Sequence, residues 1–277
     1  MNSIKKMMLS GALGCLISGM AYADGSSPQP VKPYWQDIQV VAVNKEKPRS
    51  SFMSYADRET ALTSRFEKSP YYSLLNGTWK FFFVDSYKDL PQNITDPSVN
   101  TSSWDDITVP GNWEVQGHGV AIYTNHGYEF KPRNPQPPLL PEANPVGVYR
   151  RDIEIPANWD NRDIYLHIGG AKSGLYVYLN GKEVGYSEDS KNPAEFLINK
   201  YLQPGKNVLT LKIFRWSTGS YLECQDFWRM SGIERDVFLW SQPKASIQDF
   251  RVVSTLDDTY TNGIFKLAVD LKNHTQE

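Results

Sequence analysis

The stretch RWSTGSYLECQDFWRMSGIERDV, residues 215–237, organises the sequence around it. It combines four aromatic residues with acidic and basic side chains, and it lies between two alternating apolar runs, 208–213 and 237–240. Alternation with a period of two is typical of half-buried strands. We therefore expect a polar, aromatic loop held between two strands of a β scaffold, which is where binding residues tend to lie.

Two interpretations explain the composition of this loop equally well. In the first, flat aromatic rings beside carboxylates and amides bind a sugar, whose C–H faces stack on rings and whose hydroxyls need hydrogen-bond partners. In the second, the loop is a buried ion-pair corner, in which Arg229, Glu234 and Arg235 tie it to the sheet.

The length and the composition are those of a globular protein. The 277 residues are 22% charged and 40% hydrophobic, which leaves room for one large or two medium domains. Aromatic residues make up 13% of the chain, and this richness favours β structure.

Residues 1–23 have the features of a signal peptide: Lys5 and Lys6 precede the mostly apolar run 7–20, and a small-residue cleavage site ends at Ala23. The apolar run is too short to span a bilayer, so we expect no membrane span and secretion across the inner membrane to the periplasm. Without its two lysines the mature chain carries 27 − 31 = −4 charges. This negative net charge does not attract a phosphate backbone, so we expect no nucleic acid as a partner.

The two cysteines have separate contexts. Cys15 follows 12–14, a poor lipobox, so a lipid anchor there is the less favoured alternative. Cleavage leaves only Cys224, and no intrachain disulfide can then form.

The chain before the strands is irregular. Residues 24–50 are rich in Pro, Ser and Gln, and they predict an extended N-terminal arm that is laid over the surface through Tyr34 and Trp35. A short helix is predicted over 56–67, and it is the only one the sequence supports.

Short strands follow at close spacing. The Asn76-Gly77 turn leads into an aromatic run to residue 84 that predicts a strand buried on both faces. Further strands are predicted at 149–155, 163–168, 175–179, 182–185, 195–198 and 208–216. This pattern indicates an all-β fold, with a jelly-roll β-sandwich as one domain over residues 51–241.

A boundary is predicted at Gln242-Pro243. Beyond it, 247–253 and 264–271 alternate and predict strands of a second β unit over 243–277, the start of an immunoglobulin-like sandwich. Such a domain takes about 100 residues. We therefore expect that the chain ends inside a domain and is a fragment.

From about residue 35 to the end, the sequence closely resembles the N-terminal region of the β-galactosidases of glycoside hydrolase family 2. The segments that carry the resemblance occur in order: SLLNGTWK (73–80), VPGNWE (109–114), IYTN (122–125), NPVGVYR (144–150), LNG (179–181) through GYSEDS (185–190), and 215–237.

The resemblance implies a jelly-roll sugar-binding domain, then an immunoglobulin-like domain, then a (β/α)₈ barrel that carries the chemistry. A barrel takes about 250 residues, so both catalytic glutamates and the Mg²⁺ ligands are expected outside this chain. It implies that the whole enzyme hydrolyses terminal non-reducing β-D-galactose residues of a β-galactoside as a homo-oligomer. The present chain by itself is then predicted to be inactive.

Two residues are implied to reach the sugar. Asn125, in the IYTN motif, contacts sugar hydroxyls, and Asp226 binds a hydroxyl and helps to hold Na⁺, a hard cation that prefers oxygen ligands. Two positions depart from the family pattern. Cys224 stands where an aspartate is usual, and Glu234 puts a charge where an apolar residue is common.

Other candidate sites are weaker. Glu223 and Asp226 are three residues apart, but spacing alone is poor support for a catalytic pair. Glu188-Asp189 is predicted to be an acidic turn that is solvated or hydrogen-bonded to a backbone group. The histidines share no metal-binding spacing; they are His118, His126, His167 and His274.

Two alternative functions remain open for this chain. One is a stand-alone carbohydrate-binding module or lectin, which should end near Ser241. The other is a hydrolase active in this form, whose turnover should depend on Asp226.

Overall fold

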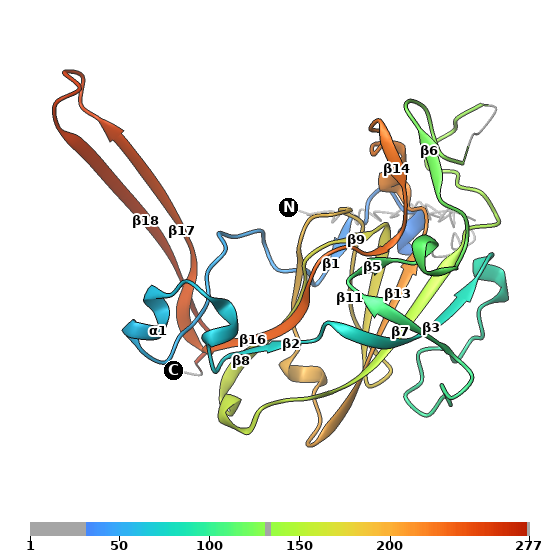
Figure 1. The fold of residues 1–277 in the computed structure, drawn as a ribbon, viewed down its shortest axis with the longest axis horizontal. Coiled ribbons are helices and arrows are strands. Elements are labelled where there is room, and N and C mark those ends of the chain that lie inside the picture. Colours follow the sequence, from blue (N-terminus) through green and yellow to red (C-terminus); the bar gives the residue numbers. More distant parts are fainter. Residues whose placement is uncertain (1–31, 131–133, 276–277) are drawn as a thin grey trace, which may run out of the picture. The chain divides into compact units, whose positions relative to one another are not determined.

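The computed structural model describes residues 32–130 and 134–275. The predicted signal peptide, Cys15 and the first residues of the predicted arm lie outside this part of the chain. The described residues are dominated by β-strands, as the sequence predicts, and the elements are labelled in Figure 1.

Two antiparallel sheets form a sandwich. The larger has seven strands in the order β1 (Ala42–Val43), β11 (Lys182–Ser187), β10 (Gly174–Leu179), β13 (Lys206–Phe214), β7 (Val146–Glu154), β3 (Gly77–Val84) and β4 (Asp105–Val109). The smaller has four strands in the order β12 (Ala194–Leu197), β8 (Arg162–Ile168), β16 (Val237–Pro243) and β2 (Tyr72–Leu74). Each strand predicted between residues 77 and 216 is confirmed by one of these.

The main core lies between the two sheets. Trp79 and Phe81 of β3 and Leu211 of β13 point inward from the larger sheet, while Leu166 of β8 and Leu239 of β16 come from the smaller one. Their alternation along each strand follows from the period of two. The alternation that predicted the strands therefore also determines which side chains fill the core.

The outer faces of the sheets are covered as well. Trp35, in the described part of the predicted arm, packs with Val148, Tyr176 and Phe214 on the outer face of the larger sheet. A second cluster, around Met53, covers the outer face of the smaller one. The chain before residue 54 therefore contributes to two hydrophobic clusters.

Two small sheets arise from the connections. One has the order β5 (Gly111–Asn112), β15 (Gly232–Ile233) and β9 (Ala171–Lys172), and the other pairs β14 (Phe227–Arg229) with β6 (Ile122–Thr124). The stretch 215–237 was predicted to be a loop, yet it contains β14 and β15. Both are short, and their partners are distant in sequence, so no local periodicity predicts them.

The helices are short. The α-helix α1 (Arg58–Leu62) begins at Asp57, whose side chain caps it by accepting from the Thr60 N–H at 2.7 Å. The helix predicted over 56–67 is therefore only partly right, since Ser64, with a φ of 55°, takes a left-handed conformation that interrupts it. The 3₁₀ helices are η1 (Tyr34–Gln36), η2 (Phe66–Lys68), η3 (Tyr87–Asp89), η4 (Glu114–Gln116), η5 (Ala157–Trp159), η6 (Asn199–Tyr201) and η7 (Thr218–Tyr221). None of the helices in the described part of the chain is long and apolar enough to cross a membrane.

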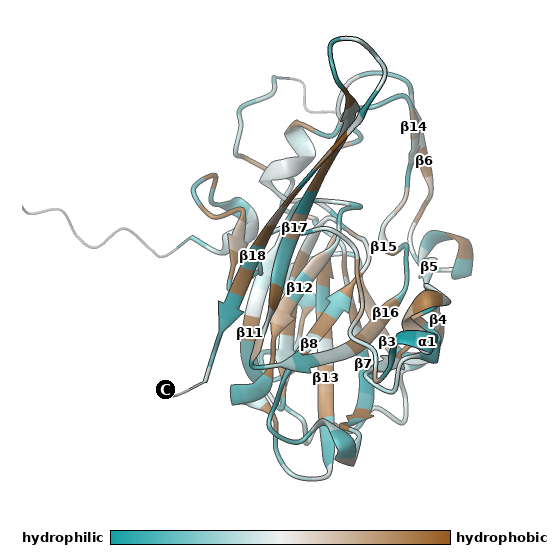
Figure 2. Cartoon of the chain, turned by 90° about the vertical axis from the view of Figure 1, so that its left-hand side faces the viewer, coloured by the Kyte–Doolittle hydropathy of each residue, from teal (hydrophilic) through white to brown (hydrophobic). Residues whose placement is uncertain are grey.

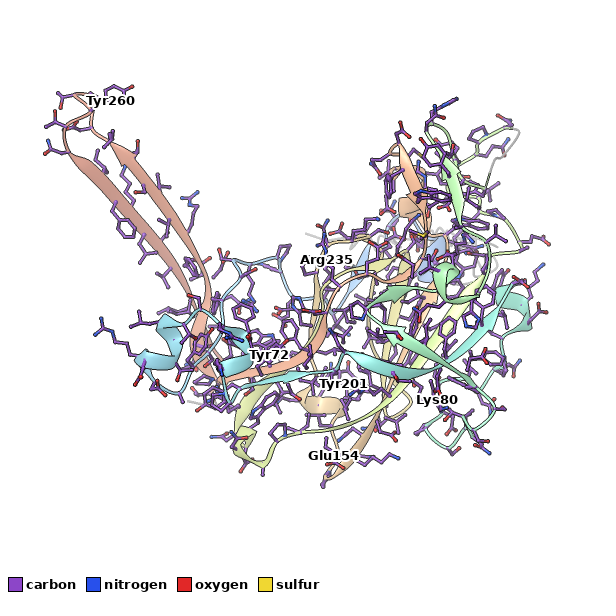
Figure 3. The ribbon with its side chains drawn as sticks, viewed as in Figure 1. Tyr72, Lys80, Glu154, Tyr201, Arg235 and Tyr260 are labelled. Carbon is purple, nitrogen blue, oxygen red and sulfur yellow. The ribbon has the colours of Figure 1, made fainter. Side chains whose placement is uncertain are left out.

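A hairpin follows the sandwich, as predicted beyond residue 243. Its strands are β17 (Ala245–Leu256) and β18 (Gly263–Asn273), and Tyr260 lies in the turn between them (Figure 3). The pairing of Val252 with Leu267 aligns hydrophobic residues, many of them exposed, along the two strands (Figure 2). The assignment of this hairpin to an immunoglobulin-like domain, and the domain boundaries, stay predictions.

Gly185 in β11 allows the arm strand β1 to approach closely. A Cβ at this position would clash with the Val43 carbonyl oxygen and would lie 2.7 Å from the Phe196 ring. We expect Gly185→Ala to lower the free energy of unfolding by about 1–3 kcal/mol through overpacking, measured by urea denaturation. In the matched variant Gly263→Ala the new Cβ meets nothing within 4 Å, and a change within about 0.5 kcal/mol is expected. Equal effects of the two substitutions would contradict this account.

Candidate functional site

The β6–β14 ribbon brings the two predicted binding residues together. Thr124 pairs with Phe227 and Tyr123 with Trp228 in an antiparallel register. Continuing that register by one residue places Asn125 opposite Asp226. The pairing thus joins two motifs that are far apart in the sequence.

One face of the ribbon carries the polar pair and an aromatic pair. Because side chains alternate along a strand, Tyr123 lies on the same side as Asn125, and Trp228 on the same side as Asp226. Tyr123 is 56% exposed and Trp228 is 53% exposed, and their ring centroids are 5.7 Å apart in an edge-to-face arrangement. Exposed aromatic surface beside an amide and a carboxylate is suited to a sugar ring and its hydroxyls.

Hydrogen bonds set the orientation of the two polar side chains. The Tyr123 hydroxyl donates to Oδ1 of Asp226 at 2.7 Å, and this hydrogen bond raises the pKa of Tyr123. Oδ2 of Asp226 has no hydrogen bond within the described residues. Oδ1 of Asn125 lies 2.8 Å from Nδ1 of His126, which leaves the Asn125 amide N–H₂ to donate.

The ribbon offers part of a cation site. Among the described residues there is no group of three His, Cys, Asp or Glu side chains that could hold a metal ion. A hard cation needs several oxygen ligands, and Oδ2 of Asp226 fits as one of them. The Na⁺ at Asp226 and the Mg²⁺ expected for the whole enzyme stay predictions.

Most aromatic residues of 215–237 are structural. Trp216 and Tyr221 are buried, and the Tyr221 hydroxyl donates to the Leu139 carbonyl. Phe227 is half-buried beneath the Lys191 ammonium, which lies 4.5 Å from the ring centroid. Trp228 is therefore the aromatic residue of this stretch that is exposed enough to stack on a sugar. Its exposed partner Tyr123 was not singled out from the sequence. The alternation of residues 122–125 was the signal that Tyr123 shares a face with Asn125.

The loop before β14 is anchored from inside. Arg229 is buried, donates to the Glu223 carbonyl at 2.7 Å, and stacks over Phe227 with its guanidinium carbon 5.0 Å from the ring centroid. Ser217 and Ser220 form a capping box at η7. These contacts fix both ends of the segment that carries Asp226.

A network of buried charges lies beside the ribbon. Nζ of Lys172 is 3.0 Å from Oε1 of Glu129, and the two side chains are only 2% and 5% exposed. Arg215 lies 3.7 Å from both Glu129 and Glu114. Glu114 also accepts the Ser231 N–H with both oxygens, although burial still raises the pKa of Glu114.

This network holds the segments on either side of the ribbon. Glu114 precedes β6 and Glu129 follows it, while Arg215 and Ser231 precede and follow β14. Buried charges are tolerated when they are paired and hydrogen-bonded. The orientation of Asn125 and Asp226 therefore depends on ion pairs outside the ribbon.

The predicted ion-pair corner is wrong in its members. Glu234 pairs with Lys191 at 3.2 Å, and Arg229 is held by a carbonyl group. No ion pair in residues 32–130 and 134–275 joins Arg229, Glu234 and Arg235. Lys172 and Glu129, which form a buried pair at 3.0 Å, belong to different parts of the sequence, and no spacing rule connects them.

The other acidic residues have separate partners. Oε1 of Glu223 accepts the Ser190 N–H at 3.2 Å and burial raises the pKa of Glu223, whereas Asp226 is exposed and bound by a tyrosine. The two carboxyl groups therefore have different environments. Glu188 is buried, with hydrogen bonds from the Tyr186 hydroxyl at 2.9 Å and the Thr218 hydroxyl at 2.5 Å, so these partners are side chains and not the backbone partner that was predicted.

Comparison with known families places these residues in a sugar-binding context. Residues 72–243 match the model described as "Glycosyl hydrolases family 2, sugar binding domain". The chain is 40% identical over 245 residues to a β-galactosidase of Priestia megaterium, covering 87% of this chain and 24% of that protein. It is 37% identical over 243 residues to one of Psychromonas ingrahamii, covering 88% and 23%. The chain thus spans about a quarter of the length of these curated relatives.

Solved structures share the fold. A β-glycosidase from Bacteroides vulgatus superposes with a TM-score of 0.56 at 22% identity, over 74% of this chain and 25% of that one. A β-glucuronidase from an uncultured Clostridium species gives a TM-score of 0.54 at 23% identity, over 72% and 33%. At this identity the likeness concerns the fold alone.

Proposed function

Because this chain belongs to glycosyl hydrolase family 2 and carries the family's sugar-binding domain, we propose that it is the N-terminal sugar-binding part of a β-galactosidase. The observation that carries the proposal is the exposed ribbon face on which Asn125, Asp226 and two aromatic rings lie together. The names and lengths of the curated relatives support the identity of the whole enzyme.

The ribbon side chains would bind the terminal galactose in complementary ways. Asp226 accepts a sugar hydroxyl through Oδ2 while the Tyr123 hydroxyl holds Oδ1 in place. Asn125 donates through its amide N–H₂. Trp228 covers the apolar face of the ring. If Na⁺ is bound, Asp226 serves as one of its ligands and the ion supplies a fixed positive charge for a sugar hydroxyl oxygen.

The bond cleavage is assigned to the part of such an enzyme that this chain does not contain. A retaining glycosidase needs two carboxyl groups about 5–5.5 Å apart, and the separate environments of Glu223 and Asp226 do not favour that role. We assign the two catalytic glutamates and the Mg²⁺ ligands to the remainder of the longer enzyme. That enzyme would act as a periplasmic homo-oligomer.

Binding to the ribbon can be tested with this chain directly. Methyl β-D-galactoside is expected to shift the imidazole NMR signals of His126, the neighbour of Asn125, and Asp226→Ala should weaken binding by about 1.5–3 kcal/mol, or roughly ten- to a hundredfold. The matched variant Asp258→Ala, in the exposed β17–β18 turn, should bind as the unmodified chain does. A chromogenic β-galactoside should not be hydrolysed above the buffer rate.

Three outcomes would contradict this proposal. Turnover that is lost in Asp226→Ala would show that the chain is a hydrolase in its present form. Nanomolar binding by a chain that ends at Ser241 would favour a lectin, because the ribbon alone supplies only part of the proposed galactose site. Equal effects of Asp226→Ala and Asp258→Ala would remove the ribbon from sugar binding.

A further inference from the structure

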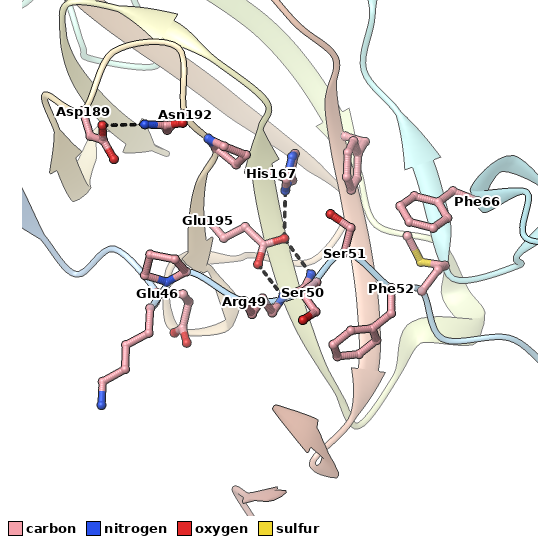
Figure 4. A pocket seen from close by; sticks show the side chains of 15 residues that line it. Glu46, Arg49, Ser50, Ser51, Phe52, Phe66, His167, Asp189, Asn192 and Glu195 are labelled. Atoms are coloured by element: carbon pink, nitrogen blue, oxygen red, sulfur yellow. Dashed lines mark hydrogen bonds and ion pairs between the residues drawn. The ribbon is translucent and has the colours of Figure 1, made fainter. Parts of the chain in front are cut away.

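A separate cavity of about 370 Å³ lies beside the smaller sheet (Figure 4). Residues 46–53, which are the end of the arm and the three residues after it, form one wall, and β8, β12 and β16 supply His167, Glu195 and Phe238. The cavity shares no lining residue with the β6–β14 ribbon. Its volume is within the range of small-molecule sites, about 300–1,000 Å³.

Apolar and aromatic groups line part of this cavity. Phe52, Met53, Phe66 and Phe238 all contribute to its surface. Met53 and Phe238 are buried, whereas Phe52 and Phe66 keep part of their surface exposed. Partly exposed rings of this kind can pack against the C–H face of a ligand.

The polar groups are arranged around Glu195. Arg49 donates to both of its oxygens, at 3.0 Å from Nε and 2.9 Å from Nη2, and Trp240 donates to Oε1 at 3.0 Å. Burial alone would raise the pKa of Glu195, but the hydrogen bond from His167 and the Arg49 guanidinium hold the pKa below its ordinary value. Glu195 is therefore an ionised carboxylate at neutral pH and can only accept.

That arrangement determines what His167 can bind. Nδ1 of His167 lies 2.8 Å from Oε1 of Glu195, so Nδ1 must carry the proton. The ring stacks on Phe238 with centroids 4.2 Å apart, which fixes its plane. In the neutral imidazole Nε2 is then an acceptor, and it has no protein partner within the described residues. An acceptor in this position suits a hydroxyl donor.

Most of the charged side chains that line the cavity have partners. Glu195 is neutralised by Arg49, Glu46 pairs with Lys272 at 3.1 Å, and Asp189 lies 3.5 Å from Lys45. Lys47 also lines the cavity; it is exposed and forms no ion pair in residues 32–130 and 134–275. The paired side chains themselves offer little attraction to an ion of either sign. A neutral ligand with hydroxyl groups and an apolar face matches this surface better.

We propose that this cavity is a second carbohydrate site, which takes a neutral mono- or disaccharide unit between the arm and the smaller sheet. The sugar packs against Phe52 and Phe66, and one of its hydroxyls donates to Nε2 of His167. This site is independent of the ribbon, and its carbohydrate class agrees with the domain's family.

The test uses the whole chain with lactose and cellobiose as separate probes, each titrated to about 10 mM, where a site of millimolar affinity is largely occupied. His167 signals report on the cavity and His126 signals report on the ribbon. We expect at least one probe to shift the His167 imidazole signals saturably, in the unmodified chain and in Asp226→Ala alike. Phe52→Ala should weaken this binding at least tenfold. His167→Phe, which keeps the ring and removes Nε2, should weaken binding tenfold when it is followed by calorimetry.

Three results would overturn the second site. The first is that neither disaccharide shifts the His167 signals, whether or not the His126 signals shift. The second site is equally overturned if the His167 shifts disappear in Asp226→Ala, or if both Phe52→Ala and His167→Phe bind as the unmodified chain does. Loss of the His126 response alone would instead count against the proposed galactose site.

Discussion

Replacing Lys172 by methionine is expected to lower the free energy of unfolding by about 3–5 kcal/mol, because it leaves the Glu129 carboxylate buried without its ammonium partner. Arg215, at 3.7 Å from Glu129, is too distant to replace the lost 3.0 Å contact fully. Urea denaturation of the whole chain measures the change. With a total stability of about 5–15 kcal/mol for a typical protein, the effect is a large fraction.

Two further variants separate the ion pair from general packing. The double replacement Lys172→Met with Glu129→Leu should recover most of the loss, since replacing both members of a buried pair is often close to neutral. Lys206→Met breaks the ion pair with Asp152, whose partners are 61% and 54% exposed, and should cost at most about 1 kcal/mol. A Lys172→Met chain no less stable than Lys206→Met would refute the network's role.

Truncating Trp35 to alanine is expected to lower the free energy of unfolding by about 3–5 kcal/mol. The side chain is only 2% exposed; its ring stacks on Phe214 at a centroid distance of 5.0 Å and meets Tyr87 edge-on at 5.1 Å. Its removal leaves a cavity in the cluster on the outer face of the larger sheet. Thermal unfolding and urea denaturation both report the loss.

The control for Trp35 lies in the same arm. Ile38 is exposed, and Ile38→Ala should change stability by no more than about 0.5 kcal/mol. Limited proteolysis should also cut residues 37–50 faster in Trp35→Ala than in the control. If both variants resist unfolding and proteolysis equally, the arm contributes little to the sandwich.

These two predictions concern residues whose depth of burial local sequence patterns do not show, although Trp35 was expected to hold the arm on the surface. Trp35 lies in a segment without periodicity, so its burial follows only from the docking of the arm on a distant sheet. Lys172 lies in the two-residue strand β9, and Glu129 lies after β6. A lone lysine is expected at the surface, and only the packing of separate segments explains its burial here.

The candidate site was predicted in part. Asn125 and Asp226 were selected because two motifs resemble those of a family, and the register of β6 and β14 places them opposite each other. The sequence did not show which aromatic residues remain exposed. Trp216 and Trp228 looked equivalent, but the first is buried, while the second lies on the open face of the ribbon.

The all-β class and the positions of the long strands follow from the sequence alone, because alternating burial is a property of neighbouring residues along one chain. The aromatic, acidic and basic side chains of the loop 215–237 are also known from the sequence. The folded chain is needed to show which charges are paired, which strands pair with β14 and β15, and how the arm contributes to the wall of a second cavity. Each of these depends on contacts between residues far apart in the chain, whose free energy is set by packing and desolvation rather than by local pattern.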